Sequence, residues 1–206
     1  MSMPHRNQLK ERRPNHTRRL NLFEPRQSFL IVCEGEKTEP YYFSRFPIPQ
    51  DSIVIVEGIG ANTLSLVKET IRLKSEKKYN QVWCVFDMDS FSIENINSAI
   101  QLAERNGIKL AYSNEAFELW YILHFEYLNS GIDRQQYKEK LNRLLGFRYQ
   151  KNNPQIYDLI WSRQKVAIRN ARRLLSEYTN PHPWTNNPST SVHLLVEQLN
   201  RLFWEE

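Results

Sequence analysis

The sequence predicts an α/β protein built on a mostly parallel, four-stranded sheet flanked by helices. Residues 28–34 and 81–86 are apolar, β-branched runs of the kind found in strands buried on both faces. Residues 51–57 and 108–112 are similar runs, and segments with helical spacing separate the four. This alternation favours a parallel sheet, because parallel strands need a crossover connection that is usually a helix.

Helix signals stand in order between the strands. A short helix is expected at 37–46, with Thr38 as a possible cap. Asn62 or Thr63 is expected to cap a second helix that runs to about residue 78. These helices would connect the first strand to the second and the second to the third.

Later signals predict a helical second half. A helix at 92–105 ends at Asn106-Gly107, a natural helix C-cap. Residues 113–125 indicate a largely buried helix, and 134–145 a further one. Two more helices are expected after Asn153-Pro154 and after residues 187–190.

Composition indicates one soluble α/β domain with additions. We expect a flexible basic arm at 1–26, a Rossmann-like domain at 27–130 and a helical extension at 131–206 that packs on it. No apolar run approaches the roughly 18 residues of a membrane span, and no secretory signal is evident. Cys33 and Cys84 lie in predicted strands and are expected to be reduced, which favours a cytoplasmic protein.

Charge is distributed unevenly along the chain. Residues 1–26 hold seven Lys/Arg and two Asp/Glu, and 134–173 hold eleven and two. The region between them is acidic, with nine Lys/Arg and fifteen Asp/Glu in 28–133. This pattern fits an acidic, metal-binding core whose polyanionic substrate is held from the sides, although solvated helix faces would also explain it.

Several basic and hydroxyl side chains are candidates for contact with nucleic acid. Lys165, Arg169 and Arg172 recur on one face of a predicted helix and either bind phosphate or face water. Ser189 and Thr190 stand at a helix N-terminus, where they bind an anion or cap the helix. The basic arm adds Arg12, Arg13, Arg18 and Arg19.

Carboxylates follow two of the predicted strands. Glu34 and Glu36 follow the first, and Asp87 and Asp89 follow the third. Ligands of open α/β sheets bind outside the carboxyl ends of the strands, so we expect these acids to converge there if the strands are neighbours. Crowded carboxylates repel one another unless a cation lies between them, and their hard oxygens select Mg²⁺ or Mn²⁺.

Three further charged residues lie near this predicted site. Glu118, an acid on an otherwise apolar helix, needs a partner, either a metal or a base such as His124 or an arginine. Lys37 follows the acidic turn and can contact the scissile phosphate, or simply face water. Glu39 either holds a second metal or is stabilised by the dipole of its helix.

The order of these motifs resembles the Toprim fold of topoisomerases, primases and OLD-family nucleases. That fold has a Glu, usually followed by Gly, after its first strand and an Asp-x-Asp after its third, which Glu34-Gly35 and Asp87-Met88-Asp89 match by position. The resemblance covers about residues 28–125. It implies Mg²⁺-dependent nucleic-acid chemistry.

A closer similarity is to the RloB/AbiLii family of bacterial defence proteins. Its motifs match VCEGEKTEPYYF (32–43), VFDMDSF (85–91), SNEAFELWYILHF (113–125) and NPSTSVHLLVEQL (187–199). One departure is Glu115, where the family often has proline. The resemblance implies that the protein acts against phage. It also implies that the protein is encoded beside a restriction system or together with an ATPase partner of the SMC/ABC type.

Together these observations predict a Mg²⁺- or Mn²⁺-dependent nuclease that acts as a defence effector. Asp87 and Asp89 would hold the cation, Glu34 would complete its ligands or act as general base, and Glu36 could hold a second metal. The alternative is a non-catalytic component that binds nucleic acid or a nucleotide around a structural Mg²⁺ site. Nucleotide-sugar transferases also use a strand-terminal Asp-x-Asp, but they do not require the Glu-Gly and need more chain. Self-association of the protein is left open.

Overall fold

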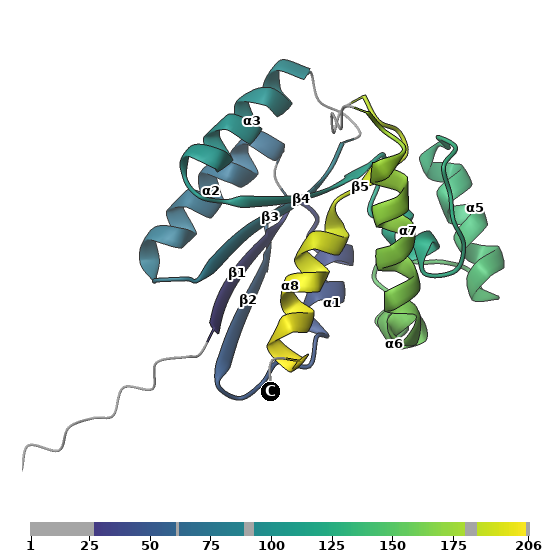
Figure 1. The fold of residues 1–206 in the computed structure, drawn as a ribbon, viewed down its shortest axis with the longest axis horizontal. Helices are drawn as coiled ribbons and strands as arrows, with labels where there is room; N and C mark the ends of the chain where they lie inside the picture. The colour runs from purple at the N-terminus through teal and green to yellow at the C-terminus, as the bar shows by residue number, and fades with distance from the viewer. Residues whose placement is uncertain (1–26, 61, 89–92, 180–184, 205–206) are drawn as a thin grey trace, which may run out of the picture.

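A computed structural model describes residues 27–60, 62–88, 93–179 and 185–204. Its centre is a five-stranded sheet with the order β2-β1-β3-β4-β5 (Figure 1). The first four strands are parallel, and β5 is antiparallel to β4. The strands are β1 (Gln27–Cys33), β2 (Ser52–Gly58), β3 (Gln81–Asp87), β4 (Lys109–Asn114) and β5 (Ser189–Thr190). The predicted fold class and the four predicted strands are therefore confirmed.

The fifth strand differs from the prediction, which placed Ser189 and Thr190 at a helix N-terminus. Thr190 pairs with Ser113 in β4, and their hydroxyl oxygens lie 3.1 Å apart. A strand of two residues has no periodic pattern, so its place in the sheet depends on β4 rather than on its own sequence.

Helices cover both faces of the sheet, with α2 and α3 together on one face and α8 and α1 on the other (Figure 1). The helices are α1 (Thr38–Ser44), α2 (Thr63–Glu76), α3 (Ile93–Arg105), α4 (Glu118–Leu123), α5 (Arg134–Leu145), α6 (Gln155–Ile160), α7 (Gln164–Ser176) and α8 (Val192–Trp204), with a 3-10 turn at Trp161–Arg163.

Two of the predicted helix ends are confirmed and one is wrong. The Asn62 side chain accepts a hydrogen bond from the Ser65 amide at 3.0 Å, and Gly107 has a left-handed φ of +63° after α3. Thr38 does not cap α1. Its hydroxyl instead donates to the carbonyl oxygen of Lys151 at 3.0 Å, which ties α1 to a distant loop.

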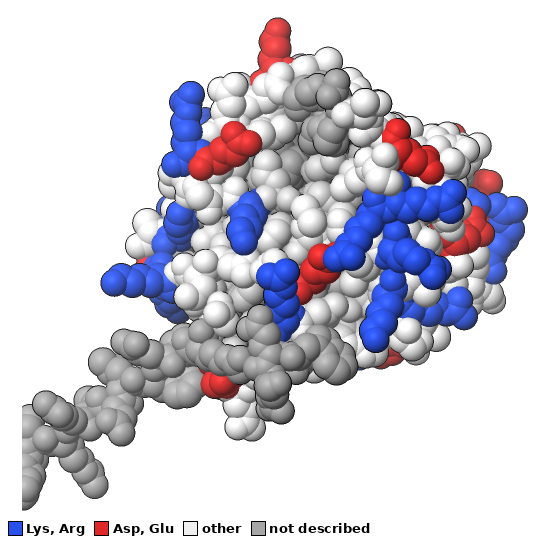
Figure 2. Space-filling view, viewed as in Figure 1, with Lys and Arg blue, Asp and Glu red and all other residues white. Residues whose placement is uncertain are grey.

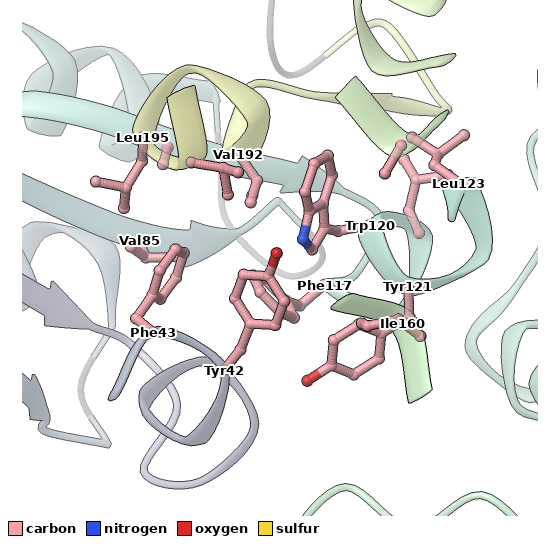
Figure 3. Packing of buried hydrophobic residues seen from close by; sticks show 14 of the residues in the cluster. Tyr42, Phe43, Val85, Phe117, Trp120, Tyr121, Leu123, Ile160, Val192 and Leu195 are labelled. Carbon is pink, nitrogen blue, oxygen red and sulfur yellow. The ribbon is translucent and has the colours of Figure 1, made fainter. Parts of the chain in front are cut away.

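The predicted helix at 113–125 is shorter than expected. Residues 113 and 114 complete β4, and only α4 is helical, with all six of its residues buried. In Figure 3 its Trp120 packs near Tyr42 of α1 and Val192 of α8. The C-terminal residues are thus part of the main core, because β5 extends the sheet and α8 packs on its face.

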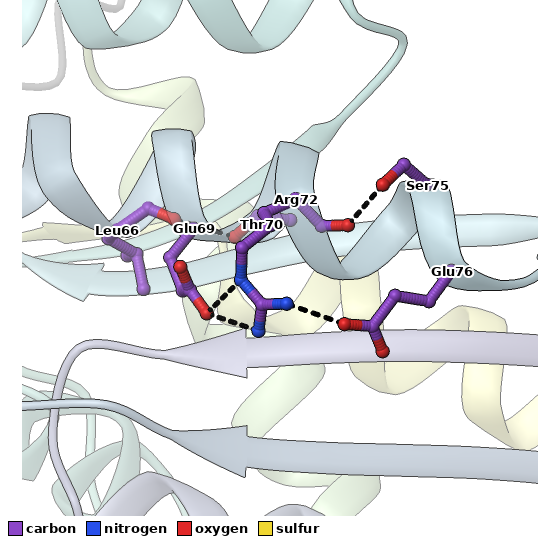
Figure 4. A network of polar contacts seen from close by, with 6 residues as sticks. All are labelled: Leu66, Glu69, Thr70, Arg72, Ser75 and Glu76. Carbon is purple, nitrogen blue, oxygen red and sulfur yellow. Dashed lines mark hydrogen bonds and ion pairs between the residues drawn. The ribbon is translucent and has the colours of Figure 1, made fainter.

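The outer surface of α2 carries a local network of charges (Figure 4). The Arg72 guanidinium contacts Glu69 at 2.7 Å and Glu76 at 2.5 Å, at the i,i+3 and i,i+4 spacings of a helix surface. Arg72 is more than half exposed. Such pairs stabilise a protein little, because water screens them.

Candidate active site

The carboxyl ends of β1 and β3 lie side by side. Strand β1 pairs with β2 on one side and β3 on the other, so a crevice is expected between β1 and β3, where the connections diverge. Glu34 directly follows β1, and Asp87 is the last residue of β3. One carboxylate oxygen of Glu34 accepts a hydrogen bond from the Asp87 amide at 3.0 Å. The structure therefore brings these two predicted site residues together.

A cavity of about 350 Å³ opens at this edge of the sheet. Its walls come from the β1–α1 turn, the end of β3, the start of α5 and the loop that follows α5. They are Glu34, Gly35, Glu36, Lys37, Thr38, Glu39, Asp87, Arg134 and Lys151. Four carboxylates thus face three cations around one opening, which we call the acidic cavity.

Asp87 has unused capacity to bind a cation. Its Oδ2 contacts the Arg134 guanidinium at 3.3 Å, whereas its buried Oδ1 has no hydrogen-bond partner. Burial, and then the charges of Glu39, Glu118 and Glu34, raise the pKa of this carboxyl well above its usual range, although Arg134 lowers it. A negative charge at Asp87 therefore needs more positive charge than the described protein groups supply.

Glu39 of α1 is buried and shares this environment. Burial is the main cause that raises the pKa of its carboxyl, and Glu118 adds to it. Its carboxylate lies over Gly35, because a Cβ on that glycine would come within 2.3 Å of Glu39 Oε2. The Glu34-Gly35 motif thus leaves room for a third acid. The Glu39 side chain lines the cavity, so its position agrees with a site role and not only with stabilisation by the helix dipole.

Glu118 has protein partners that the sequence prediction missed. It accepts a hydrogen bond from the Tyr149 hydroxyl at 3.0 Å, and the Lys151 ammonium lies 3.8 Å away. His124 is not its partner, because that ring contacts the carbonyl oxygen of Trp120 at 2.8 Å. Burial and the charge of Glu118 raise the pKa of Tyr149, so the phenol stays protonated as a donor.

Local structure positions Arg134, Tyr149 and Lys151, the three site residues that the sequence prediction missed. A capping box between Asp133 and Gln136 begins α5 at Arg134. Gly146, with φ +77°, ends α5 and lets the chain turn back towards α1. The one available signal was the basic charge of residues 134–173, which does not say which cations face the carboxylates.

The other predicted residues lie in different places. Glu36 and Lys37 are exposed at the cavity wall. Asp89 falls outside the described residues, and so does the predicted arm with Arg12, Arg13, Arg18 and Arg19.

The predicted nucleic-acid surface is divided. Lys165, Arg169 and Arg172 are exposed on α7, although Arg172 pairs with Glu197 at 2.9 Å. Figure 2 shows basic side chains gathered on the side of the molecule where α7 lies. Ser189 and Thr190 are fully buried, so the expectation that they contact nucleic acid is corrected. The Thr190 hydroxyl lies against β4, 3.1 Å from Ser113 Oγ, because the segment pairs with that strand.

The donor set partly fits a divalent cation. Among the described residues, no three His, Cys, Asp or Glu side chains form a group arranged to hold a metal ion. The second acid of the Asp-x-Asp pair lies outside these residues. Glu34 and the unpartnered oxygen of Asp87 have the hard-oxygen chemistry that Mg²⁺ prefers, in surroundings with an excess of negative charge.

Comparison with known proteins gives one match. A family model described as "RloB-like protein" matches residues 29–199, most of the chain. Searches of curated proteins and of solved structures found no match. In the part of the chain that the structure describes, no helix is both long and apolar enough to cross a membrane.

Proposed function

The chain belongs to the RloB-like family, and we propose that it is a nuclease that uses Mg²⁺ or Mn²⁺ to cleave phosphodiester bonds. The observation that carries this proposal is the pairing of Glu34 with Asp87 at the carboxyl ends of adjacent strands, with a buried Asp87 oxygen left unpartnered. The Toprim-like order of the motifs supports it.

The residues of the acidic cavity have distinct roles in this proposal. Glu34, Asp87 and Asp89 would hold the cation, which would neutralise phosphate oxygens and stabilise the charge that builds in the transition state. The Asp87 amide orients Glu34, so that its carboxylate can accept a proton from an attacking water. Lys37 and Lys151 line the same cavity and would contact phosphate oxygens.

The biological role that we propose is defence against phage, with a separate ATPase as the partner. Family membership and the similarity of four motifs to RloB/AbiLii proteins support this role. The exposed basic side chains of α7 offer a surface for nucleic acid or for that partner.

A second candidate function is binding without catalysis. It is favoured by the ion pairs of the site, because Arg134 and Lys151 each face a carboxylate, and the described residues hold no group of three metal ligands. The protein would then bind nucleic acid or a nucleotide as a non-catalytic defence component with a structural cation.

Cleavage and metal binding should be measured together. We expect the wild-type protein to nick plasmid or cleave tRNA with Mg²⁺ or Mn²⁺, and Glu34→Ala and Asp87→Ala to abolish this activity. Titration with Mn²⁺ followed by electron paramagnetic resonance tests the site even where cleavage needs the partner. Wild-type Mn²⁺ binding that both variants retain would overturn the proposal. Metal binding that depends on Asp87, without cleavage when the ATPase is present, would favour the second candidate.

A further inference from the structure

A second cleft lies next to the acidic cavity, and Lys151 lines both. Its volume is about 530 Å³, and its walls come from α5 and the loop at 148–152. Figure 1 shows α5 on the side of the molecule opposite α2 and α3. Side chains at its walls include Gln135, Lys138, Arg148, Gln150, Lys151 and Asn152. We call it the basic cleft.

The basic cleft and the acidic cavity have opposite charge. Among the residues that the structure describes, the walls of this cleft hold Lys138, Arg148 and Lys151 but no Asp or Glu. Lys138 and Arg148 are exposed, and neither takes part in any of the ion pairs described above. A polyanion can therefore lie in the cleft with its phosphates on Lys138, Arg148 and Lys151, while the next phosphate reaches the cation proposed at the carboxylates.

Amide side chains give the cleft a second property. Gln150 and Asn152 are exposed, and each offers both a donor and an acceptor. Such side chains match the hydrogen-bonding edges of nucleobases. In single strands all of these edges are accessible, whereas in a duplex the pairing partner occupies the Watson–Crick edge and leaves only the groove edges.

We propose that the basic cleft binds single-stranded nucleic acid next to the bond that is cut. Lys138 and Arg148 contact phosphates, and Gln150 and Asn152 contact base edges. This inference rests on the proposed nuclease function, for which it names the substrate class. Lys151, at the junction, would then contact the phosphate that passes from the cleft to the carboxylates.

The test measures binding without cleavage. Fluorescence anisotropy in EDTA would compare single-stranded RNA, single-stranded DNA and duplex DNA of about 12 nucleotides and mixed sequence. The variant Lys138→Glu/Arg148→Glu should bind either single strand at least about tenfold more weakly than wild type. The matched control Lys77→Glu/Lys78→Glu has the same change in charge just after α2 and should retain wild-type affinity. Melting curves verify that both variants fold.

A second variant tests the contacts to bases. Gln150→Ala/Asn152→Ala should weaken single-strand binding without changing its salt dependence, because no phosphate contact is lost.

The outcomes separate the inference from the proposed function. An equal loss of affinity in the control Lys77→Glu/Lys78→Glu, or a preference of the wild type for duplex, would overturn the inference. If binding depends on the cleft but no metal-dependent cleavage is found with the ATPase present, the cleft is supported and the nuclease proposal fails. If cleavage occurs and the cleft variants bind and cleave normally, the inference fails alone. A preference between the two single strands would identify the substrate as RNA or DNA.

Discussion

The outer face of α2 and the acidic cavity both bring opposite charges together, but they do so in different ways. On α2 the partners Glu69, Arg72 and Glu76 lie within one helix and are largely exposed. In the cavity the acids come from the ends of β1 and β3 and from α1, while Arg134 and Lys151 come from distant segments. The contrast indicates that α2 uses charge for solubility and local helix stability, whereas the cavity concentrates charge in a place where it costs stability.

The largest expected effect concerns Asp87. In Asp87→Asn we expect cleavage to fall about 10²–10⁴-fold, because the residue proposed to hold the cation loses its charge. The free energy of unfolding should stay the same or rise by about 1 kcal/mol, since repulsion from Glu39 and Glu118 is removed. Activity assays and urea denaturation measure the two effects. Glu69→Gln on α2 is the matched control and should change neither. A clear loss of stability in Asp87→Asn would mean that this acid is structural.

His124, a buried histidine at the end of α4, predicts a pH dependence of stability. Burial is the main cause that lowers the pKa of His124 from 6.5 to about 4, with a contribution from Arg163, while hydrogen bonds to Trp120 and Tyr121 oppose it. Between these two pH values His124 binds more protons in the unfolded chain than in the folded chain, so its contribution to stability should rise with pH across this window. The raised pKa values of Asp87 and Glu39 act in the opposite direction, so the contribution of His124 is the difference between the wild type and a His124 variant. The contribution of His124 to the free energy of unfolding changes by up to about 3 kcal/mol across this window.

Urea denaturation at pH 5 and pH 7 checks this expectation, and His124→Gln should reduce the dependence. His193 is buried as well, and burial lowers its pKa too, so part of the dependence should remain in the variant. An unchanged profile in His124→Gln would show that His124 does not set it.

The smallest expected effect compares two arginines. In Arg134→Met we expect a loss of about 1–2 kcal/mol, because Asp87 is left without its cation in a mostly buried position; the loss is limited by the exposure of Arg134. Arg72→Met removes the cation of exposed pairs and should not measurably change stability. Mg²⁺ should raise the melting temperature of Arg134→Met more than that of wild type, if the ion takes the place of the guanidinium. Equal effects of the two substitutions would remove the contrast between the regions.

The elements that follow local rules were predictable. The four longer strands, α5 at 134–145 and the caps at Asn62 and Gly107 were expected close to where they occur. The proximity of Glu34 and Asp87 was expected on the condition that their strands are neighbours, and the sheet order meets this condition. The exposed ion pairs of α2 are local as well, because their partners are three and four residues apart in the sequence.

The sequence by itself determined the strand–helix alternation and the position of an acid at the end of each of two strands, because backbone periodicity and chain direction are encoded locally. Tertiary structure alone decided that Tyr149 and Lys151 hold Glu118, that Arg134 faces Asp87 and that Ser189–Thr190 becomes a strand. These contacts join residues far apart in the chain. No local pattern specifies them, because each depends on how α5 and the C-terminal segment pack against a sheet that is already formed.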